Sequence, residues 1–144
     1  MDTPSTMICV EVTVHKPVAL VWQAWTSPEA IAAWNIPFDH WWVPKVETEL
    51  REGGAFCYRM EAKDGNEGFD HKGIYDQVTP HKQIAYTLTD GRKAVIRFVE
   101  HGDTTAVVEQ FEPEANLAEA VQHDFCASVL NRFKAYTENI KIPE

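Results

Sequence analysis

The residue of this chain that is best suited to bind a ligand or to transfer a proton is His71, in the strand-like segment GFDHKGIYDQV, residues 68–78. In an extended segment, His71 faces the same side as Phe69 and Tyr75. A free imidazole with a pKa of about 6.5 can hydrogen-bond a ligand carbonyl or act as a general base. The simpler interpretation of the same pattern is a structural histidine whose ring nitrogens are satisfied within the protein.

A second candidate region is WNIPFDHWWVP, residues 34–44. Its aromatic rings are those of Trp34, Phe38, Trp41 and Trp42. Neighbouring side chains of an extended segment face opposite ways, so one of Trp41 and Trp42 should face a cavity and the other should lie outside. Asp39 and His40 lie among these rings, but sequence neighbours on a loop seldom form a catalytic pair. The segment is interpreted either as a rigid aromatic lid over a pocket or as rings that fill one end of a core.

The spacing of the polar residues does not match a metal centre or a cofactor motif. The six histidines and three cysteines are scattered, and the sequence has no Cys-x-x-Cys pair, glycine-rich phosphate loop or nucleophile elbow. We therefore predict no metal and no cofactor. Cys9, Cys57 and Cys126 are expected to be reduced, buried and unreactive.

The charge balance limits the partners. With 22 acidic and 13 basic residues the formal net charge is −9, which opposes attraction to nucleic acid or to an anionic membrane. No run reaches the roughly 18 apolar residues of a membrane span. We expect no nucleic-acid partner, no membrane span, a cytoplasmic location and one domain over residues 1–144. The acidic run of Glu109, Glu112, Glu114 and Glu119 is expected to be a solvated surface.

The elements that must position these residues follow from hydrophobic periodicity. Alternation predicts strands over residues 7–15, 45–50, 55–60, 68–78, 83–90, 93–101 and 104–112, and helical spacing predicts helices over 18–26, 29–34 and 117–140. Ser27 is the expected cap of the second helix, and Gly53 and Gly54 predict a tight hairpin turn. The short connections between strands favour an antiparallel meander.

The terminal helix is the longest predicted element, at about 35 Å. Its expected apolar face consists of Val121, Phe125, Val129, Phe133, Tyr136 and Ile140. The opposite face carries Ala127, Asn131, Lys134 and Glu138. We expect the apolar face to lie against the concave side of the sheet. Arg132 falls at its edge, where it could bind an acidic group or extend its guanidinium into water.

Strand parity also selects the side chains expected to face inward. This set consists of Phe56, Tyr58, Met60, Phe69, His71, Tyr75, Tyr86, Ile96 and Phe98. Gly73 falls on the same side as His71, where it would leave room for a ligand or for the long helix. The inner face is therefore unusually rich in aromatic rings.

Several segments resemble those of one superfamily. They are PEAIAAW, LREGGAFCYRM, DGNEGFDHKGIYDQVTP, IAYTLTDGR, TTAVVEQFEPE and VLNRFKAY, in this order along almost the whole chain. The chain resembles the START-like SRPBCC superfamily, and within it bacterial proteins similar to the activator of the heat-shock protein 90 ATPase. The resemblance implies an α+β helix-grip fold, in which a curved antiparallel sheet wraps around a long C-terminal helix and encloses a cavity. It also implies that relatives include ligand binders, enzymes and chaperone-binding proteins.

Together these features predict a non-enzymatic protein that binds a small, mostly apolar or aromatic ligand between sheet and helix. The residues expected to line the site are Trp34, Phe38, Trp41, Phe56, Tyr58, His71, Tyr75, Tyr86, Phe98 and Phe125. The resemblance leaves two alternatives open. One is a regulator of the heat-shock protein 90 ATPase with a chaperone as partner, and the other is an enzyme similar to the cyclase or hydratase branch, with His71 as base. The sequence sets no oligomeric state.

Overall fold

A computed structural model describes residues 7–36 and 38–140. The strands are β1 (Ile8–Val14), β2 (Trp41–Thr48), β3 (Ala55–Ala62), β4 (Gly68–Thr79), β5 (Gln83–Leu88), β6 (Lys93–His101) and β7 (Thr104–Phe111). The helices are α1 (Val18–Thr26), α2 (Pro28–Trp34) and α3 (Glu119–Glu138). This order confirms the predicted α+β arrangement of one strand, two short helices, six strands and a long terminal helix.

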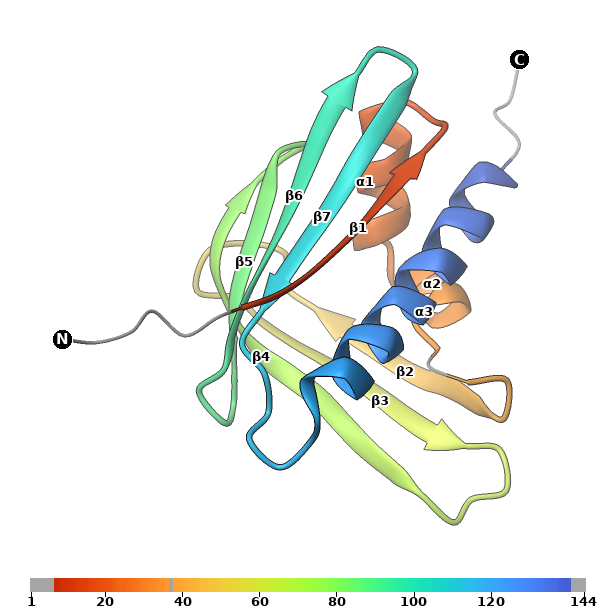
Figure 1. The fold of residues 1–144 in the computed structure, drawn as a ribbon, viewed down its shortest axis with the longest axis vertical. Helices are drawn as coiled ribbons and strands as arrows, with labels where there is room; N and C mark the ends of the chain where they lie inside the picture. Colours follow the sequence, from red (N-terminus) through yellow and green to blue (C-terminus); the bar gives the residue numbers. More distant parts are fainter. Residues whose placement is uncertain (1–6, 37, 141–144) are drawn as a thin grey trace, which may run out of the picture.

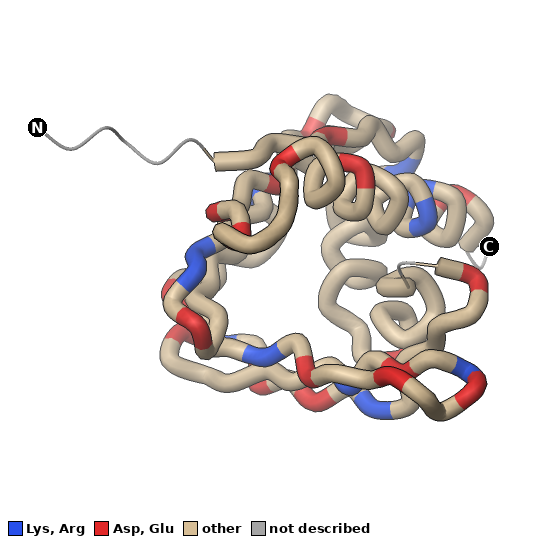
Figure 2. The backbone as a smooth tube through the Cα atoms, turned by 60° about the horizontal axis from the view of Figure 1, so that its bottom comes forward, with Lys and Arg blue, Asp and Glu red and all other residues tan. Residues whose placement is uncertain are grey.

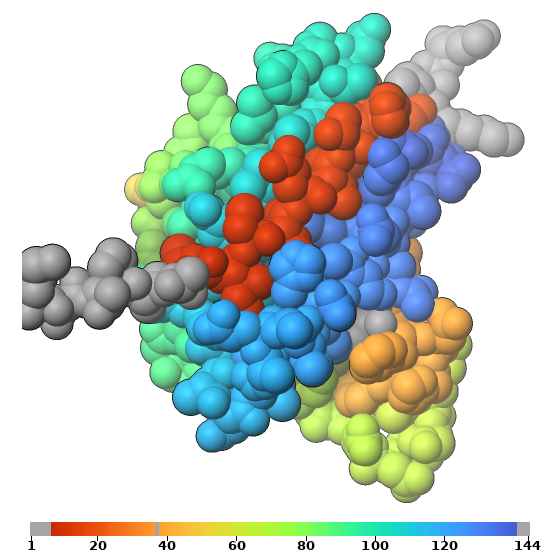
Figure 3. All heavy atoms as spheres, in the orientation of Figure 1, coloured from red at the N-terminus to blue at the C-terminus, as the bar shows by residue number. Residues whose placement is uncertain are grey.

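The seven strands form one antiparallel sheet in the order β1-β7-β6-β5-β4-β3-β2. The sheet is strongly curled, and all three helices lie on its concave side (Figure 1). Seen toward one end, the sheet forms an open curve that the helices close, and acidic and basic positions are interspersed along the backbone (Figure 2). On the surface, α3 lies between the two edges of the sheet, β1 and the start of β2 (Figure 3). None of the helices in the described part of the chain has the length and apolarity needed to cross a bilayer.

Local sequence explains how the first elements form. In β1 the buried residues Ile8, Val10 and Val14 share one parity, as the alternation predicts. Pro17 precedes α1, and its carbonyl accepts the first helical hydrogen bonds, from the backbone N–H groups of Leu20 and Val21 at 3.1 Å. Ser27 occupies the cap position of α2 as expected, but its side chain makes no capping hydrogen bond.

The predicted hairpin turn joins β2 to β3, and its two glycines have different roles. Gly53 has a φ of 82°, in the left-handed region that favours glycine. Gly54 is required by close approach, because a Cβ there would lie 2.1 Å from the carbonyl oxygen of Glu49. The turn is also tied to β4, since the N–H of Gly53 donates to the carbonyl of Tyr75 at 2.8 Å.

An aromatic cluster holds α3 on the sheet. Phe133 is fully buried and packs edge-to-face against Trp25 and Trp34, with centroid distances of 4.9 and 4.8 Å. Trp25 also contacts Phe98 at 5.9 Å, and Phe98 contacts Trp22 at 5.2 Å. These five rings come from α1, α2, β6 and α3, so one cluster joins both short helices, the sheet and the terminal helix. We call it the aromatic plug.

The buried face of α3 differs from the predicted one in its first half. Phe133 is buried as expected, and so is its neighbour on the helix, Leu130, but Val121 and Phe125 are 59% and 41% exposed. Gln122 and Thr137 are buried instead. The cause is that the first turns of α3 pass over the mouth of a cavity and do not pack on the sheet, so side chains at 121 and 125 lie along its rim.

Because α3 buries Phe133 and exposes Val121, truncating these two side chains should change the stability of the protein by very different amounts. Phe133→Ala should lower the free energy of unfolding by about 3 to 5 kcal/mol, because it opens a void in the aromatic plug. Val121→Ala should change it by no more than about 0.5 kcal/mol, since the side chain is largely solvated. Urea denaturation followed by circular dichroism measures both, and similar losses for the two variants would contradict the register.

The end of α3 is tied to the turn between β1 and α1 by Glu138. Its Oε2 accepts the backbone N–H of His15 at 2.8 Å, and it lies 2.9 Å from His15 Nδ1 and 3.3 Å from Lys134 Nζ. These groups, with the His15 N–H the strongest, lower the pKa of Glu138 from 4.5 to about 2.

Because the folded-state pKa is depressed, ionised Glu138 stabilises the protein above about pH 4.5, and this stabilisation is lost as the pH falls toward about 2. At pH 7, Glu138→Gln should lower the free energy of unfolding by about 1 kcal/mol, a value that allows for screening at this accessible site. The difference from the wild type should shrink between these two pH values. Glu100→Gln, at an exposed position, is the control; a loss for Glu138→Gln that does not vary with pH would contradict this assignment.

Candidate ligand-binding site

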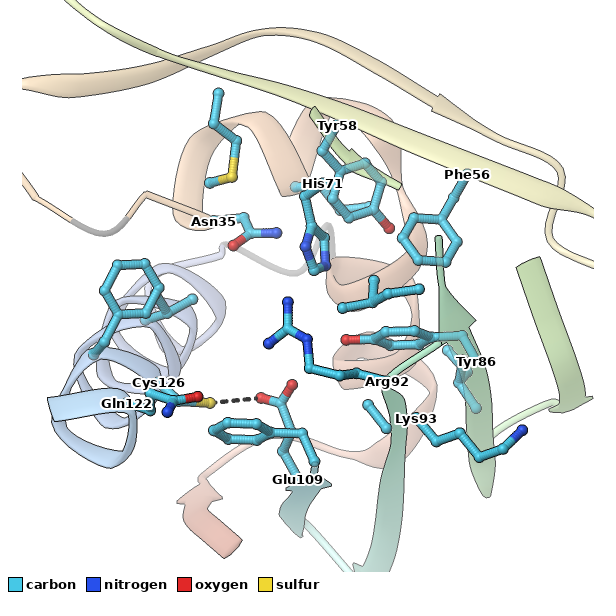
Figure 4. A pocket seen from close by; sticks show the side chains of 18 of the residues that line it. Asn35, Phe56, Tyr58, His71, Tyr86, Arg92, Lys93, Glu109, Gln122 and Cys126 are labelled. Atoms are coloured by element: carbon cyan, nitrogen blue, oxygen red, sulfur yellow. Dashed lines mark hydrogen bonds between the residues drawn. The ribbon is translucent and has the colours of Figure 1, made fainter. Parts of the chain in front are cut away.

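A cavity of about 400 Å³ lies between the concave face of the sheet and the first half of α3. Its wall draws side chains from β3 to β7, from the ends of α1 and α2, and from the segment before α3. Figure 4 shows aromatic rings and a few polar groups pointing into the space between α3 and the strands. The cavity exists because the aromatic plug fills the concave face at one end only.

Seven of the ten predicted site residues line this cavity. They are Trp34, Phe56, Tyr58, His71, Tyr75, Tyr86 and Phe125. Phe56 lies at the centre of the aromatic wall, with Tyr75 and Tyr86 each at 5.0 Å between ring centroids. The strand parity of β3, β4 and β5 thus brings these side chains together as the sequence indicated.

Phe98 does not line the cavity, and its ring packs instead against Trp22 and Trp25 within the aromatic plug. Ile96, also expected along the wall, is buried in the main core beside it. Phe98 and Ile96 therefore point inward, as predicted. They reach a part of the concave face that is filled by the core and the aromatic plug, and not the cavity.

The segment from residue 34 to residue 44 is not one lid. Trp34 ends α2, where its indole Nε1 donates to the carbonyl of Ala24 at 2.9 Å, and Trp41 begins β2. Trp41 packs in a separate small core with Val43, Met60 and Ala62. It lies outside the cavity, whereas Trp42 is 45% exposed. The two adjacent rings do face opposite ways, as their extended backbone requires.

Phe38 lies outside the cavity wall, at its rim. Its side chain is 49% exposed, contacts Phe125 edge-on at 5.9 Å and stacks on His40 at 5.7 Å. The neighbouring Asp39 accepts a hydrogen bond from Arg132 Nη2 at 2.8 Å, which lowers the pKa of Asp39. Asp39 therefore binds the terminal helix and does not form a catalytic pair with His40.

Gly73 allows β4 and β5 to approach closely and does not make room for a ligand. A Cβ at this position would lie 2.3 Å from the carbonyl oxygen of Thr87 on β5. The expectation that Gly73 leaves room for a ligand or for the long helix is wrong, because the space is taken by the backbone of the neighbouring strand.

His71 points into the cavity among aromatic rings (Figure 4). The rings of Phe56 and Tyr58 lie 5.8 and 5.9 Å from its own, and Tyr86 lies 6.1 Å away. Burial, together with the nearby Arg92 guanidinium, lowers the pKa of His71 from 6.5 to about 4. At neutral pH the imidazole is uncharged and offers one donor and one acceptor nitrogen.

The hydroxyls of Tyr58 and Tyr86 are also neutral at pH 7. Burial raises the pKa of Tyr58 and Tyr86 well above the ordinary value. The hydroxyl of Tyr75 is within 2.7 Å of Thr48 Oγ1, so it is engaged by β2. Tyr58 and Tyr86 thus present polar ends on otherwise apolar walls.

The prediction that Glu109 belongs to a solvated surface is wrong. Glu109 lines the cavity, and its Oε1 accepts a hydrogen bond from Cys126 Sγ at 3.0 Å. Burial raises the pKa of Glu109 above its usual value. The signal was present in the sequence, because Glu109 has the same strand parity as Val107 and Phe111, and only its acidic neighbours suggested a solvated surface.

Gln122 organises the segment that leads into α3. Its side-chain Oε1 accepts the backbone N–H of Glu114 at 2.8 Å, and its Nε2 donates to the carbonyls of Glu114 and Leu117 at 2.9 Å. A buried glutamine with three backbone partners fixes the rim of the cavity beside α3. The helical periodicity of the sequence did not predict that Gln122 would be buried.

Large apolar side chains are exposed around the opening of the cavity. Those that also line its wall are Phe69, Leu117, Val121 and Phe125. Together with Phe38, which contacts Phe125, we call these side chains the apolar rim. An apolar molecule entering between β4 and α3 would contact these side chains first.

The cysteines are unpaired, and one of them corrects the prediction of burial. Cys9 is exposed, whereas Cys57 and Cys126 are partly buried. Within the described residues, no three His, Cys, Asp or Glu side chains are grouped so that they could hold a metal ion.

A curled sheet that grips one long helix over an internal cavity defines a helix-grip protein of the START-like type. The family model described as "Activator of Hsp90 ATPase homolog 1-like protein" matches residues 15–138. The chain belongs to this family.

Solved structures agree with the family assignment. The chain is similar to Chr148 from Cytophaga hutchinsonii, with 44% identity, 92% of each chain covered and a TM-score of 0.82. It is also similar to an AHSA1-like protein from Aeromonas hydrophila, with 29% identity, a TM-score of 0.83 and coverage of 94% of this chain and 99% of that one. Protein CV1439 from Chromobacterium violaceum, at 21% identity, a TM-score of 0.80 and coverage of 94% and 99%, shares the fold. No curated protein matches the sequence.

The Glu109–Cys126 contact predicts the order of thiol reactivity. Iodoacetamide should alkylate exposed Cys9 fastest and Cys126 slowest, because burial and the Glu109 carboxylate both raise the pKa of Cys126. Glu109→Gln removes the negative charge and should speed alkylation of Cys126, whereas Glu100→Gln should not. Peptide mass spectrometry over a time course measures each site, and equal rates for Cys9 and Cys126 in the folded protein would refute the expected order.

Proposed function

We propose that this protein binds a small, mostly apolar molecule in the cavity between its sheet and α3, without chemically changing it. The observation that carries the proposal is the cavity itself, whose volume of about 400 Å³ falls in the usual range of ligand pockets. Its wall combines aromatic rings with a few polar groups that could orient a ligand, the pattern expected of a small-molecule site.

The apolar rim supports the same role. Exposed Phe69, Val121 and Phe125 are costly to leave in water, and they also line the cavity. A ligand lying in the opening would cover part of this surface. Binding would thus remove apolar area from water on both partners.

An enzymatic role with His71 as base has less support. A general base works best when its pKa lies near the working pH, whereas that of His71 is lowered to about 4. Among the described residues, His71 also has no carboxylate hydrogen-bonded to it that would raise its basicity. Its neutral imidazole is better suited to hydrogen-bonding a ligand than to abstracting a proton.

Regulation of a heat-shock protein 90 ATPase is the rival role that the family description suggests. It depends on an outer surface, whereas the proposal depends on the cavity. An ATPase assay with the cognate chaperone separates them, because a protein that acts only by ligand binding leaves the rate unchanged.

The proposal predicts saturable binding of a neutral apolar dye, N-phenyl-1-naphthylamine, with one molecule per chain. Val129→Trp places extra volume in the cavity and should weaken binding by at least about tenfold. Val99→Trp makes the same change at an exposed position of β6 and should leave the dissociation constant unchanged. Dye fluorescence gives the constants, and circular dichroism checks that both variants fold.

Two results would count against the proposal. One is the absence of saturable dye binding to the wild-type protein. The other is equal weakening by the two tryptophan variants, which would place the dye outside the cavity.

A further inference from the structure

Glu109 occupies a position where the sheet would be expected to carry an apolar side chain. Its partners across the sheet are Val10 on β1 and Ile96 on β6, both buried. Along β7, Val107 and Phe111 share its parity, the first fully buried and the second lining the cavity. An ionisable group at such a position costs stability unless it has a partner or a function.

The protein supplies little compensation for this carboxyl group. Among the described residues, its one hydrogen bond comes from the Cys126 thiol, a weak donor, and no ion pair reaches it. Of the two basic residues that line the cavity, Arg92 donates through Nε to Asp90 at 2.8 Å, and Lys93 donates through Nζ to Thr87 at 3.1 Å. The Arg92 guanidinium is directed into the same space (Figure 4), but among the described residues no hydrogen bond or ion pair joins either cation to Glu109.

The surroundings of Glu109 suit a cation that has an apolar body. Tyr86 is close enough for the Glu109 charge to raise its pKa, and Figure 4 shows the carboxyl group directed into the space that the aromatic side chains enclose. Aromatic faces attract cations as well as apolar groups. A ligand ammonium could therefore pair with the carboxylate while its apolar part lies against the rings of β3 to β5.

We propose that Glu109 selects ligands that are apolar amines, with the protonated amino group paired to its carboxylate and the apolar body directed toward Phe56 and Tyr58. This inference rests on the proposed function, since it names the class of ligand for the same cavity. It assigns to Cys126 a positioning role, in which the thiol holds one carboxylate oxygen and leaves the other for the ligand.

A matched probe series tests the inference. The probes share one apolar body and differ in the polar end: 1-ethylnaphthalene, 2-(1-naphthyl)ethanol, 2-(1-naphthyl)ethylamine and 1-naphthylacetate. Isothermal titration calorimetry at pH 7 should give the amine a dissociation constant at least about tenfold below those of the other three, as expected for a desolvated ion pair. Glu109→Gln should abolish this preference, because the amide has no negative charge to pair with the ammonium, while continued binding of 1-ethylnaphthalene shows that the cavity is intact.

Glu100→Gln is the matched control, because it removes the same charge from an exposed position. The formal net charge of −9 attracts any cation weakly, and a preference that depends only on this general field would fall equally in both variants. Such an equal loss would overturn the assignment of Glu109. The preference should instead survive in Glu100→Gln.

The remaining outcomes separate this inference from the proposed function. If the hydrocarbon and the alcohol bind but the amine binds no more tightly, the inference fails and the apolar cavity site stands. If the carboxylate binds best, Arg92 selects the ligand and the inference fails. If no probe binds, both the proposed function and the inference fail.

Discussion

The packing of Phe133 against Trp25 and Trp34 is the interaction on which the rest of this structure depends. It fixes the second half of α3 to both short helices and, through Phe98, to the sheet. A single helix cannot cover a curled seven-stranded sheet along its whole length, because the concave face is wider than one helix. Once the aromatic plug has sealed one end, the first half of α3 passes over a space that large side chains line but do not fill.

The polar groups in that space show how its chemistry is set by burial. His71 is held neutral because an imidazolium would be poorly solvated among aromatic rings, and the Tyr58 and Tyr86 hydroxyls stay protonated for the same reason. Burial also raises the pKa of Glu109, whose only hydrogen-bond partner among the described residues is the Cys126 thiol. A site of this kind can discriminate among apolar ligands by one polar contact while the aromatic wall supplies most of the affinity.

The sequence predicted the fold and much of the cavity wall because both follow from local periodicity. Strand parity placed Phe56, Tyr58 and His71 on one inner face, and a two-residue period tolerates small errors in strand ends. The failures have a different origin. Trp41 and Gly73 depend on which strand lies next to them, and Glu109 depends on how far the sheet encloses its carboxyl group. Those are long-range properties of a curled sheet, which no local pattern contains.

Anomalous diffraction from crystals soaked in 1-bromonaphthalene tests whether an apolar molecule occupies the space between α3 and the sheet. We expect a bromine peak inside the sheet, between Tyr86 and Val129, with Phe133 and its neighbouring rings unmoved. Rings of Phe56, Tyr86 and Phe125 packed together across the space, with no bromine peak between them, would contradict it.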